Sequence, residues 1–166
     1  MSRPSILVAG VGNIFLGDDG FGVAVARRLL GRPQPACVRV VDFGIQGIDL
    51  AYALLEPYEV VVLADVVQRN SAPGTIHVLD LADEAARPPG RSPEAHGLVP
   101  TRAIEMARML GARIPRLVLV GCEPASFGRP QEGEFGLTPA VAAAVDAAAE
   151  TIEALIAGPI PAAPHA

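Results

Sequence analysis

The residues of this chain that could carry metal or acid–base chemistry are a few aspartates and one histidine. Asp18 and Asp19 follow an apolar run, Asp42 ends a second run, and Asp65 comes directly after five apolar residues. A carboxylate at the end of so apolar a segment is costly unless it is paired, caps a turn or binds a metal. His96 lies at the end of a Pro-, Gly- and charge-rich segment. Two carboxylates and one imidazole at one edge of a sheet would form a metal site with coordination positions left open.

Each of these residues also has an ordinary explanation when it is taken alone. Asp65 could cap the turn that follows its strand. Asp18 and Asp19 could simply favour the first turn of a helix through its dipole, and His96 could be a surface histidine. As a set, their oxygen and nitrogen donors fit Zn²⁺, Ni²⁺, Mn²⁺ or Fe²⁺ and do not choose among these ions.

Strands and helices alternate along the chain, which predicts an α/β fold with a largely parallel sheet. The hydrophobic patterns predict strands over 5–9, 38–41, 59–65, 75–81 and 116–122. They predict helices over 18–30, 49–55 and 98–110, and a fourth helix from 139 to Gly158. Asp18 or Asp19 is expected to cap the first helix, and the Thr138 hydroxyl the last. Ligands of such sheets bind beyond the carboxyl ends of the strands, where the candidate aspartates fall.

Length and composition narrow the class of protein. The 166 residues suit a single domain, expected over 1–158, with a frayed tail over 159–166. A net charge of −5 gives no basic footprint for nucleic acid. No apolar run approaches the ~20 residues that span a bilayer, so we expect a soluble cytoplasmic protein without membrane insertion. Cys37 and Cys122 lie in apolar runs and are interpreted as buried core thiols.

Two other kinds of site have weaker support. Gly10-Val11-Gly12 begins like a dinucleotide fingerprint, but Phe15 occupies the position of the third glycine. Nucleophilic catalysis lacks a G-x-S-x-G motif, and no histidine motif accompanies Cys122. His77 lies within a predicted strand and His165 in the tail, so neither is a good ligand candidate.

The order of motifs along the chain resembles that of the hydrogenase maturation proteases. The resemblance begins with residues 6–23, ILVAGVGNIFLGDDGFGV, where a strand and a GxGN turn precede an acidic pair. It continues through DFGIQG at 42–47, LAD at 63–65, APGT at 72–75, HGL at 96–98, VGCEP at 120–124 and GLTP at 136–139.

This resemblance implies a fold, a site and a substrate. The fold is a three-layer α/β/α sandwich, phosphorylase/hydrolase-like, with a mixed, mostly parallel five-stranded sheet. The implied activity is a metal-dependent endopeptidase that removes the C-terminal extension of a nickel-loaded [NiFe]-hydrogenase large-subunit precursor. By motif position, the catalytic and metal-binding residues are Asp19, Asp65 and His96. The nickel comes with the precursor, although Zn or another divalent ion could occupy the site.

The family's recognition loop corresponds to Asp42, Gly44, Gln46 and Gly47 in this chain. The family often has DGGT where this chain has Asp42-Phe43-Gly44-Ile45, and often Glu at the Asp19 position. Three alternatives remain open: a nickel-dependent chaperone that holds the precursor without cutting it, a dinucleotide-binding oxidoreductase, and a general aminopeptidase-like metalloenzyme.

Overall fold

A computed structural model describes residues 4–81, 98–132 and 134–158. The elements in chain order are β1 (Ile6–Val11), η1 (Gly17–Gly20), α1 (Phe21–Leu30), β2 (Val38–Gly44), α2 (Gly47–Ala53), β3 (Val60–Val66), β4 (Ile76–Asp80), α3 (Leu98–Met109), β5 (Arg116–Cys122), η3 (Pro130–Glu132) and α4 (Pro139–Ala157). Strands and helices therefore alternate in the order that the sequence predicts.

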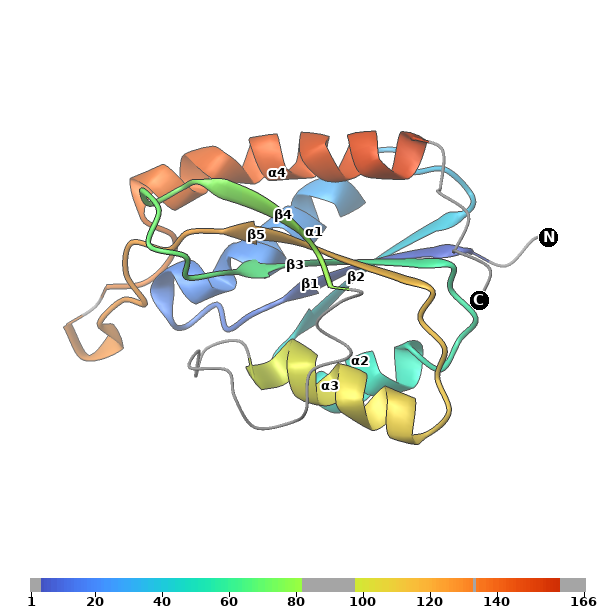
Figure 1. Cartoon of the computed structure of the whole chain (residues 1–166). Coiled ribbons are helices and arrows are strands. Elements are labelled where there is room, and N and C mark those ends of the chain that lie inside the picture. The colour runs from blue at the N-terminus through green and yellow to red at the C-terminus, as the bar shows by residue number, and fades with distance from the viewer. Residues whose placement is uncertain (1–3, 82–97, 133, 159–166) are drawn as a thin grey trace.

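The strands form one sheet in the order β2-β1-β3-β5-β4. Four strands are parallel, and β4 pairs antiparallel with β5 at the edge. Helices α1 and α4 cover one face of the sheet, and α2 and α3 cover the other (Figure 1). This is the predicted α/β/α sandwich with a mixed, mostly parallel five-stranded sheet.

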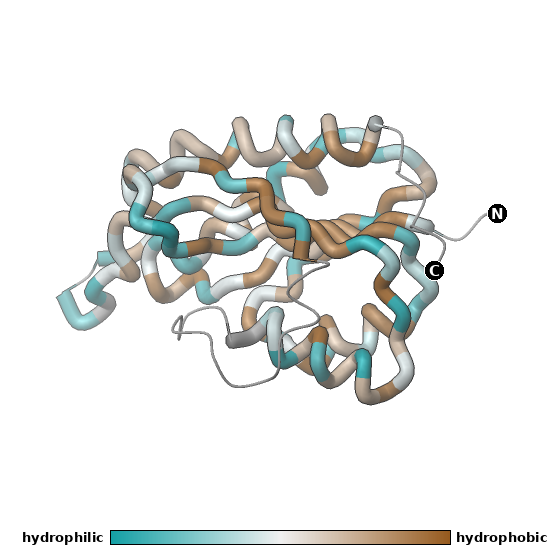
Figure 2. Tube along the Cα trace, in the orientation of Figure 1, coloured by the Kyte–Doolittle hydropathy of each residue, from teal (hydrophilic) through white to brown (hydrophobic). Residues whose placement is uncertain are grey.

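The core consists of two apolar layers, one on each side of the sheet. Alternate strand residues, such as Val8 and Val62, pack against α1 and α4, while Leu7 and Leu63 pack against α2 and α3. Figure 2 shows the resulting band of hydrophobic residues along the central strands. Because β1 and β3 are covered on both faces, they are apolar along almost their whole length. A polar residue in these strands must therefore have a particular reason to be there.

The predicted bounds are right at β5 and differ by up to three residues elsewhere. The largest differences are three residues, at the end of β2 and at the start of the first helix, where residues 17–20 form a 3₁₀ turn before α1 starts at Phe21. The prediction that Asp18 or Asp19 caps this helix is wrong, since the cap residue is Gly20 and no side chain bonds there. Thr138 does precede α4, but its hydroxyl makes no capping bond and points to another partner.

Cys37 was expected in the core and is exposed instead. It lies in the turn before β2, and its carbonyl oxygen accepts hydrogen bonds from the amides of Ser5 and Ile6. The backbone at Cys37 therefore joins β1 while its side chain stays at the surface. Cys122 is buried, as predicted.

No helix in the described part of the chain is long and apolar enough to cross a membrane. The tail over 159–166, expected to be frayed, lies outside the described residues.

Candidate metal and peptidase site

The turn between β1 and α1 folds back tightly on itself and positions the acidic pair. Gly12 has a φ of +146°, and a Cβ there would overlap the carbonyl oxygen of Asp19. The Asp19 carboxylate in turn accepts a hydrogen bond of 2.9 Å from the amide of Asn13. The glycine is therefore explained by close packing of the turn, without a bound nucleotide.

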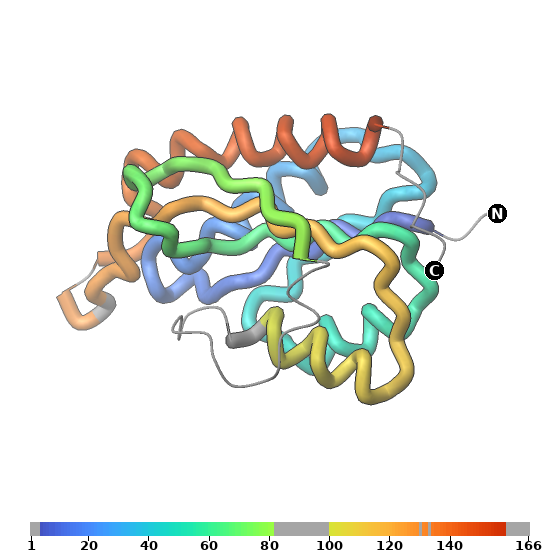
Figure 3. Tube along the Cα trace, viewed as in Figure 1, coloured from blue at the N-terminus to red at the C-terminus, as the bar shows by residue number. Residues whose placement is uncertain are grey.

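Asp18 is fully buried and joins the turn to a distant part of the chain. Its carboxylate accepts hydrogen bonds from the amides of Ala125, Ser126 and Thr138 at 2.8, 3.0 and 2.7 Å. The Thr138 hydroxyl donates to the same group at 2.9–3.0 Å. Figure 3 shows these two segments side by side, residues 12–20 in blue and the chain leading to α4 in orange. Asp18 therefore has a structural role that the sequence analysis did not predict.

Asp65 lies near the carboxyl end of β3 and is only 3% exposed. Within the described residues, its carboxyl accepts one hydrogen bond, from the amide of Val66 at 2.8 Å. Burial raises the pKa of the Asp65 carboxyl well above its usual range, and the negative charge of Asp19 raises it further. The two carboxyls are therefore within electrostatic reach, as expected of groups that share one site.

Two of the three predicted metal ligands lie in the described part of the chain. Asp19 and Asp65 lie at the same edge of the sheet, since η1 packs against β3. His96 lies outside the described residues. Among residues 4–81, 98–132 and 134–158, no three His, Cys, Asp or Glu side chains gather as metal ligands. The three-residue site and the role of each member stay a prediction.

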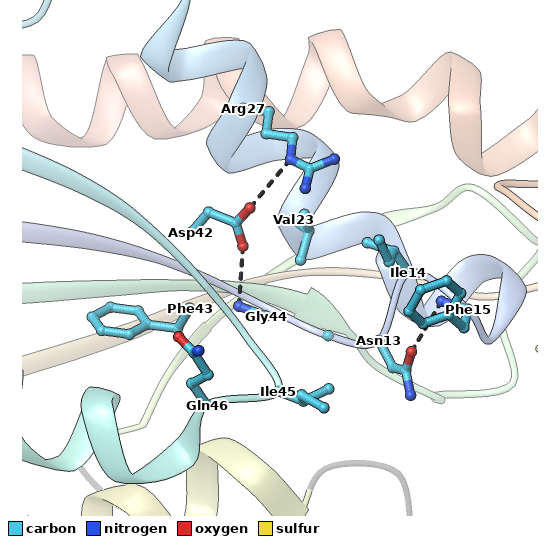
Figure 4. Close-up of a pocket in the computed structure, with 11 residues that line it drawn as sticks. Asn13, Ile14, Phe15, Val23, Arg27, Asp42, Phe43, Gly44, Ile45 and Gln46 are labelled. Atoms are coloured by element: carbon cyan, nitrogen blue, oxygen red, sulfur yellow. Dashed lines mark hydrogen bonds and ion pairs between the residues drawn. The ribbon is translucent and has the colours of Figure 1, made fainter.

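A pocket of about 300 Å³ opens beside this edge, at the ends of β1 and β2 (Figure 4). Its lining includes Asp42, Gly44 and Gln46, three of the four residues expected to recognise substrate. The fourth, Gly47, begins α2 and is not part of the lining. Asn13 also lines the pocket, and its amide binds Asp19, so the pocket adjoins the acidic turn. Their role in substrate recognition stays a prediction.

Two groups near the end of β5 bear on other chemistry. Burial, assisted by the negative charges of Asp18 and Glu123, raises the pKa of the Cys122 thiol to about 12. A thiol with so high a pKa is a poor nucleophile, which agrees with the interpretation of Cys122 as a core residue.

Glu123 is a buried carboxylate that the sequence analysis missed. It is 6% exposed, accepts a hydrogen bond from the amide of Arg69 at 2.8 Å, and lies 3.8 Å from Nε2 of His77. Its position directly after an apolar strand was the signal that could have identified it, as it identified Asp65. Its bond to Arg69 ties the loop between β3 and β4 to the end of β5.

Known proteins are similar to this chain over almost its whole length. The sequence model of the hydrogenase maturation protease family matches residues 23–155. The hydrogenase 2 maturation protease of Escherichia coli is 32% identical over 153 residues, which cover 91% of this chain and 90% of that protein. The hydrogenase expression/formation protein HupD of Rhodobacter capsulatus is 32% identical over 152 residues, with 90% of this chain and 70% of that protein covered.

Solved structures agree with the sequence comparison. The hydrogenase-maturating endopeptidase HybD of E. coli superposes with a TM-score of 0.76 at 30% identity, covering 92% of this chain and 91% of that one. A hydrogenase 2 maturation peptidase from a thaumarchaeon gives a TM-score of 0.68 at 30% identity, covering 92% and 97%. The fold, the acidic turn and these likenesses together show that the chain belongs to the hydrogenase maturation protease family and is a peptidase.

Proposed function

We propose that this peptidase removes the C-terminal extension of a nickel-loaded [NiFe]-hydrogenase large-subunit precursor. The nickel is part of the substrate, and Asp19, Asp65 and His96 bind it. Two E. coli relatives, a hydrogenase 2 maturation protease and a hydrogenase-maturating endopeptidase, support this class of substrate by their names.

The observation that carries the proposal is the buried carboxyl of Asp65. Its raised pKa means that ionising Asp65 beside Asp19 is costly in the protein alone. A divalent cation removes that cost, because it attracts both carboxylates and replaces the hydration that burial took away. Carboxylate and imidazole donors suit Ni²⁺, and they suit Zn²⁺ as well.

The chain's own residues then have distinct tasks. Asp19 and Asp65 hold the precursor at its metal centre, which brings the cleavable peptide bond to the edge of the sheet. One of these carboxylates also acts as general base for the attacking water. A bound divalent ion would polarise the scissile carbonyl or lower the pKa of that water.

The end of β2 and the turn that follows it supply contacts to the precursor's polypeptide. Asp42, Gly44 and Gln46 face the pocket next to the acidic turn, and Gly47 starts the helix behind them. Contacts in this pocket would distinguish one precursor from another without altering the chemistry at the peptide bond.

Intact mass measurement of a large-subunit precursor tests the proposal. Nickel-loaded and nickel-free precursor are incubated with the protein in parallel. We expect loss of one C-terminal peptide from the loaded sample alone. Cleavage of both samples would contradict the role of nickel. Stable binding of a loaded cognate precursor without any loss of mass would contradict the peptidase step on this substrate and favour a chaperone.

A further inference from the structure

The pocket at the ends of β1 and β2 has an apolar rim on two sides. Phe15, in the turn after β1, is 65% exposed, and Ile45, after β2, is 63% exposed. Ile14 adds a third exposed apolar side chain beside Phe15 (Figure 4). Large exposed apolar side chains that bracket a pocket are typical of surfaces that bind a polypeptide.

The pocket also contains an ion pair between Asp42 and Arg27, in which the carboxylate makes more hydrogen bonds than the guanidinium. Asp42 uses both oxygens: one accepts the amide of Gly44 at 3.0 Å, and the other accepts Nε of Arg27 at 3.2 Å. Toward residues that the structure describes, Arg27 uses only its Nε, and its side chain is 62% exposed. Its two Nη groups make no hydrogen bond or ion pair with the described part of the chain.

This arrangement leaves the outer edge of a positive group available in the pocket. Asp42 fixes the guanidinium through Nε, and the outer edge with the two Nη groups extends beyond the carboxylate (Figure 4). A guanidinium edge of this kind binds carboxylates in a bidentate manner. A basic side chain would instead meet the Arg27 charge and an Asp42 carboxylate whose two oxygens each already accept a hydrogen bond.

We propose that this pocket binds an acidic residue of the substrate polypeptide, with its carboxylate on the Nη groups of Arg27. Apolar side chains on either side of that acid pack against Phe15 and Ile45. Arg27 is therefore a specificity-determining residue, which the sequence analysis did not single out. That the polypeptide is a hydrogenase precursor rests on the proposed function, whereas the preference for an acid does not.

Three peptides that differ at one residue test the preference. The probes are acetyl-Ser-Gly-Leu-Xaa-Leu-Gly-Ser-amide with Glu, Gln or Lys at Xaa, and binding is followed by NMR shifts of the Gly12, Phe15 and Gly44 amides. We expect the Glu peptide to bind about fivefold more tightly than the Gln peptide, as suits a partly exposed ion pair. The Lys peptide should bind most weakly.

Arg27→Met should abolish the difference between the Glu and Gln peptides. Arg28→Met is the matched control, because Arg28 is the next residue of α1 but pairs with Asp146 of α4, 3.0 Å away, outside the pocket. This control should keep the fivefold preference. Arg27→Glu should reverse the order and favour the Lys peptide.

Three results would overturn the proposal: equal binding of the Glu and Gln peptides, tightest binding of the Lys peptide, or no shift at the pocket with any peptide. None of them depends on nickel or on cleavage. A protein that cleaves the loaded precursor but ignores the charge of the probe keeps the proposed function and loses this inference. A protein that prefers the Glu peptide but leaves the precursor intact does the opposite.

Discussion

Asp18 and Asp65 are both buried carboxyls at the same edge of the sheet, and their surroundings differ sharply. Asp18 accepts hydrogen bonds from three backbone amides and one hydroxyl. Asp65 accepts a single bond within the described residues, and burial together with the charge of Asp19 raises its pKa. Within the described residues, one buried acid thus has four hydrogen-bond donors and the other has one.

This difference distinguishes an acid that stabilises the fold from an acid that is available for chemistry. A carboxylate surrounded by donors stabilises the fold and has little capacity left for a ligand. A carboxyl that is buried with few donors costs stability, and such groups concentrate at functional sites. Asp19 is adjacent to Asp18 in the sequence, but we group it with Asp65, because its negative charge raises the pKa of the Asp65 carboxyl.

Replacing Asp65 should give the largest effect on activity. Asp65→Ala removes a group proposed both to bind nickel and to act on water, so processing of the loaded precursor should fall about 1000-fold. The rate is measured by intact mass over time. Asp146→Ala is the control, because Asp146 is an exposed acid that pairs with Arg28 and Arg32 far from the site. Processing by Asp65→Ala at the wild-type rate would remove Asp65 from the mechanism.

Replacing Asp18 should act on the fold instead. Asp18→Ala leaves the amides of Ala125, Ser126 and Thr138 without their acceptor, and the free energy of unfolding should fall by about 3 kcal/mol. Urea denaturation measures the loss, with Asp19→Ala for comparison. Asp19→Ala should lower the free energy of unfolding less than Asp18→Ala does. It should lower the rate of processing per folded molecule more. The opposite order would show that the two acids have been assigned the wrong roles.

The pH dependence of stability should report the cost of burying Asp65. Burial raises the pKa of Asp65 in the folded protein. The protonated carboxyl therefore contributes its full stabilisation below the pKa of the unfolded chain, which is about 4. As the pH rises from there through the folded pKa, this contribution is lost, by up to about 1.4 kcal/mol per pH unit. The difference in unfolding free energy between wild type and Asp65→Asn isolates this slope. A difference that does not change with pH would mean that Asp65 ionises normally in the folded protein.

The smallest expected effect concerns the hydroxyl of Thr138. Thr138→Val removes the hydroxyl's bond to Asp18 but keeps the amide's, so stability should fall by about 1 kcal/mol. Thr151→Val is the matched control, since the Thr151 hydroxyl only donates to the carbonyl of Ala147 within α4. Equal losses in the two variants would mean that the hydroxyl bond to Asp18 adds nothing specific.

The sequence predicts the sheet well because burial on both faces requires long apolar runs. β3 and β5 are such runs, and their predicted bounds are within one residue of the structure. Helix ends are harder, since a cap depends on where the side chain finds a partner. Thr138 is in the predicted place before α4, yet its hydroxyl binds an acid 120 residues away in the sequence.

For the site, the sequence gives candidates but not their partners. The strand-end pattern selects Asp65 because a carboxylate is unexpected after an apolar strand, and the structure finds it buried. The same pattern treats Asp18 and Asp19 alike, because their difference lies in contacts with residues 125–138 that only the fold creates. The sequence does not single out Arg27 for a similar reason, because Arg27 is in α1 and its partner Asp42 is in β2.

The hydrogen bonds of Asp18 also affect the entropy change when a ligand binds the adjacent Asp19. The acidic turn is held to the chain before α4 through Asp18, and Asn13 is held to the Asp19 carboxylate within the turn. A segment fixed in this way has little conformational freedom left to lose when a ligand arrives. A ligand that binds Asp19 therefore meets a carboxylate already in position, and folding, rather than association, bears the cost of ordering it.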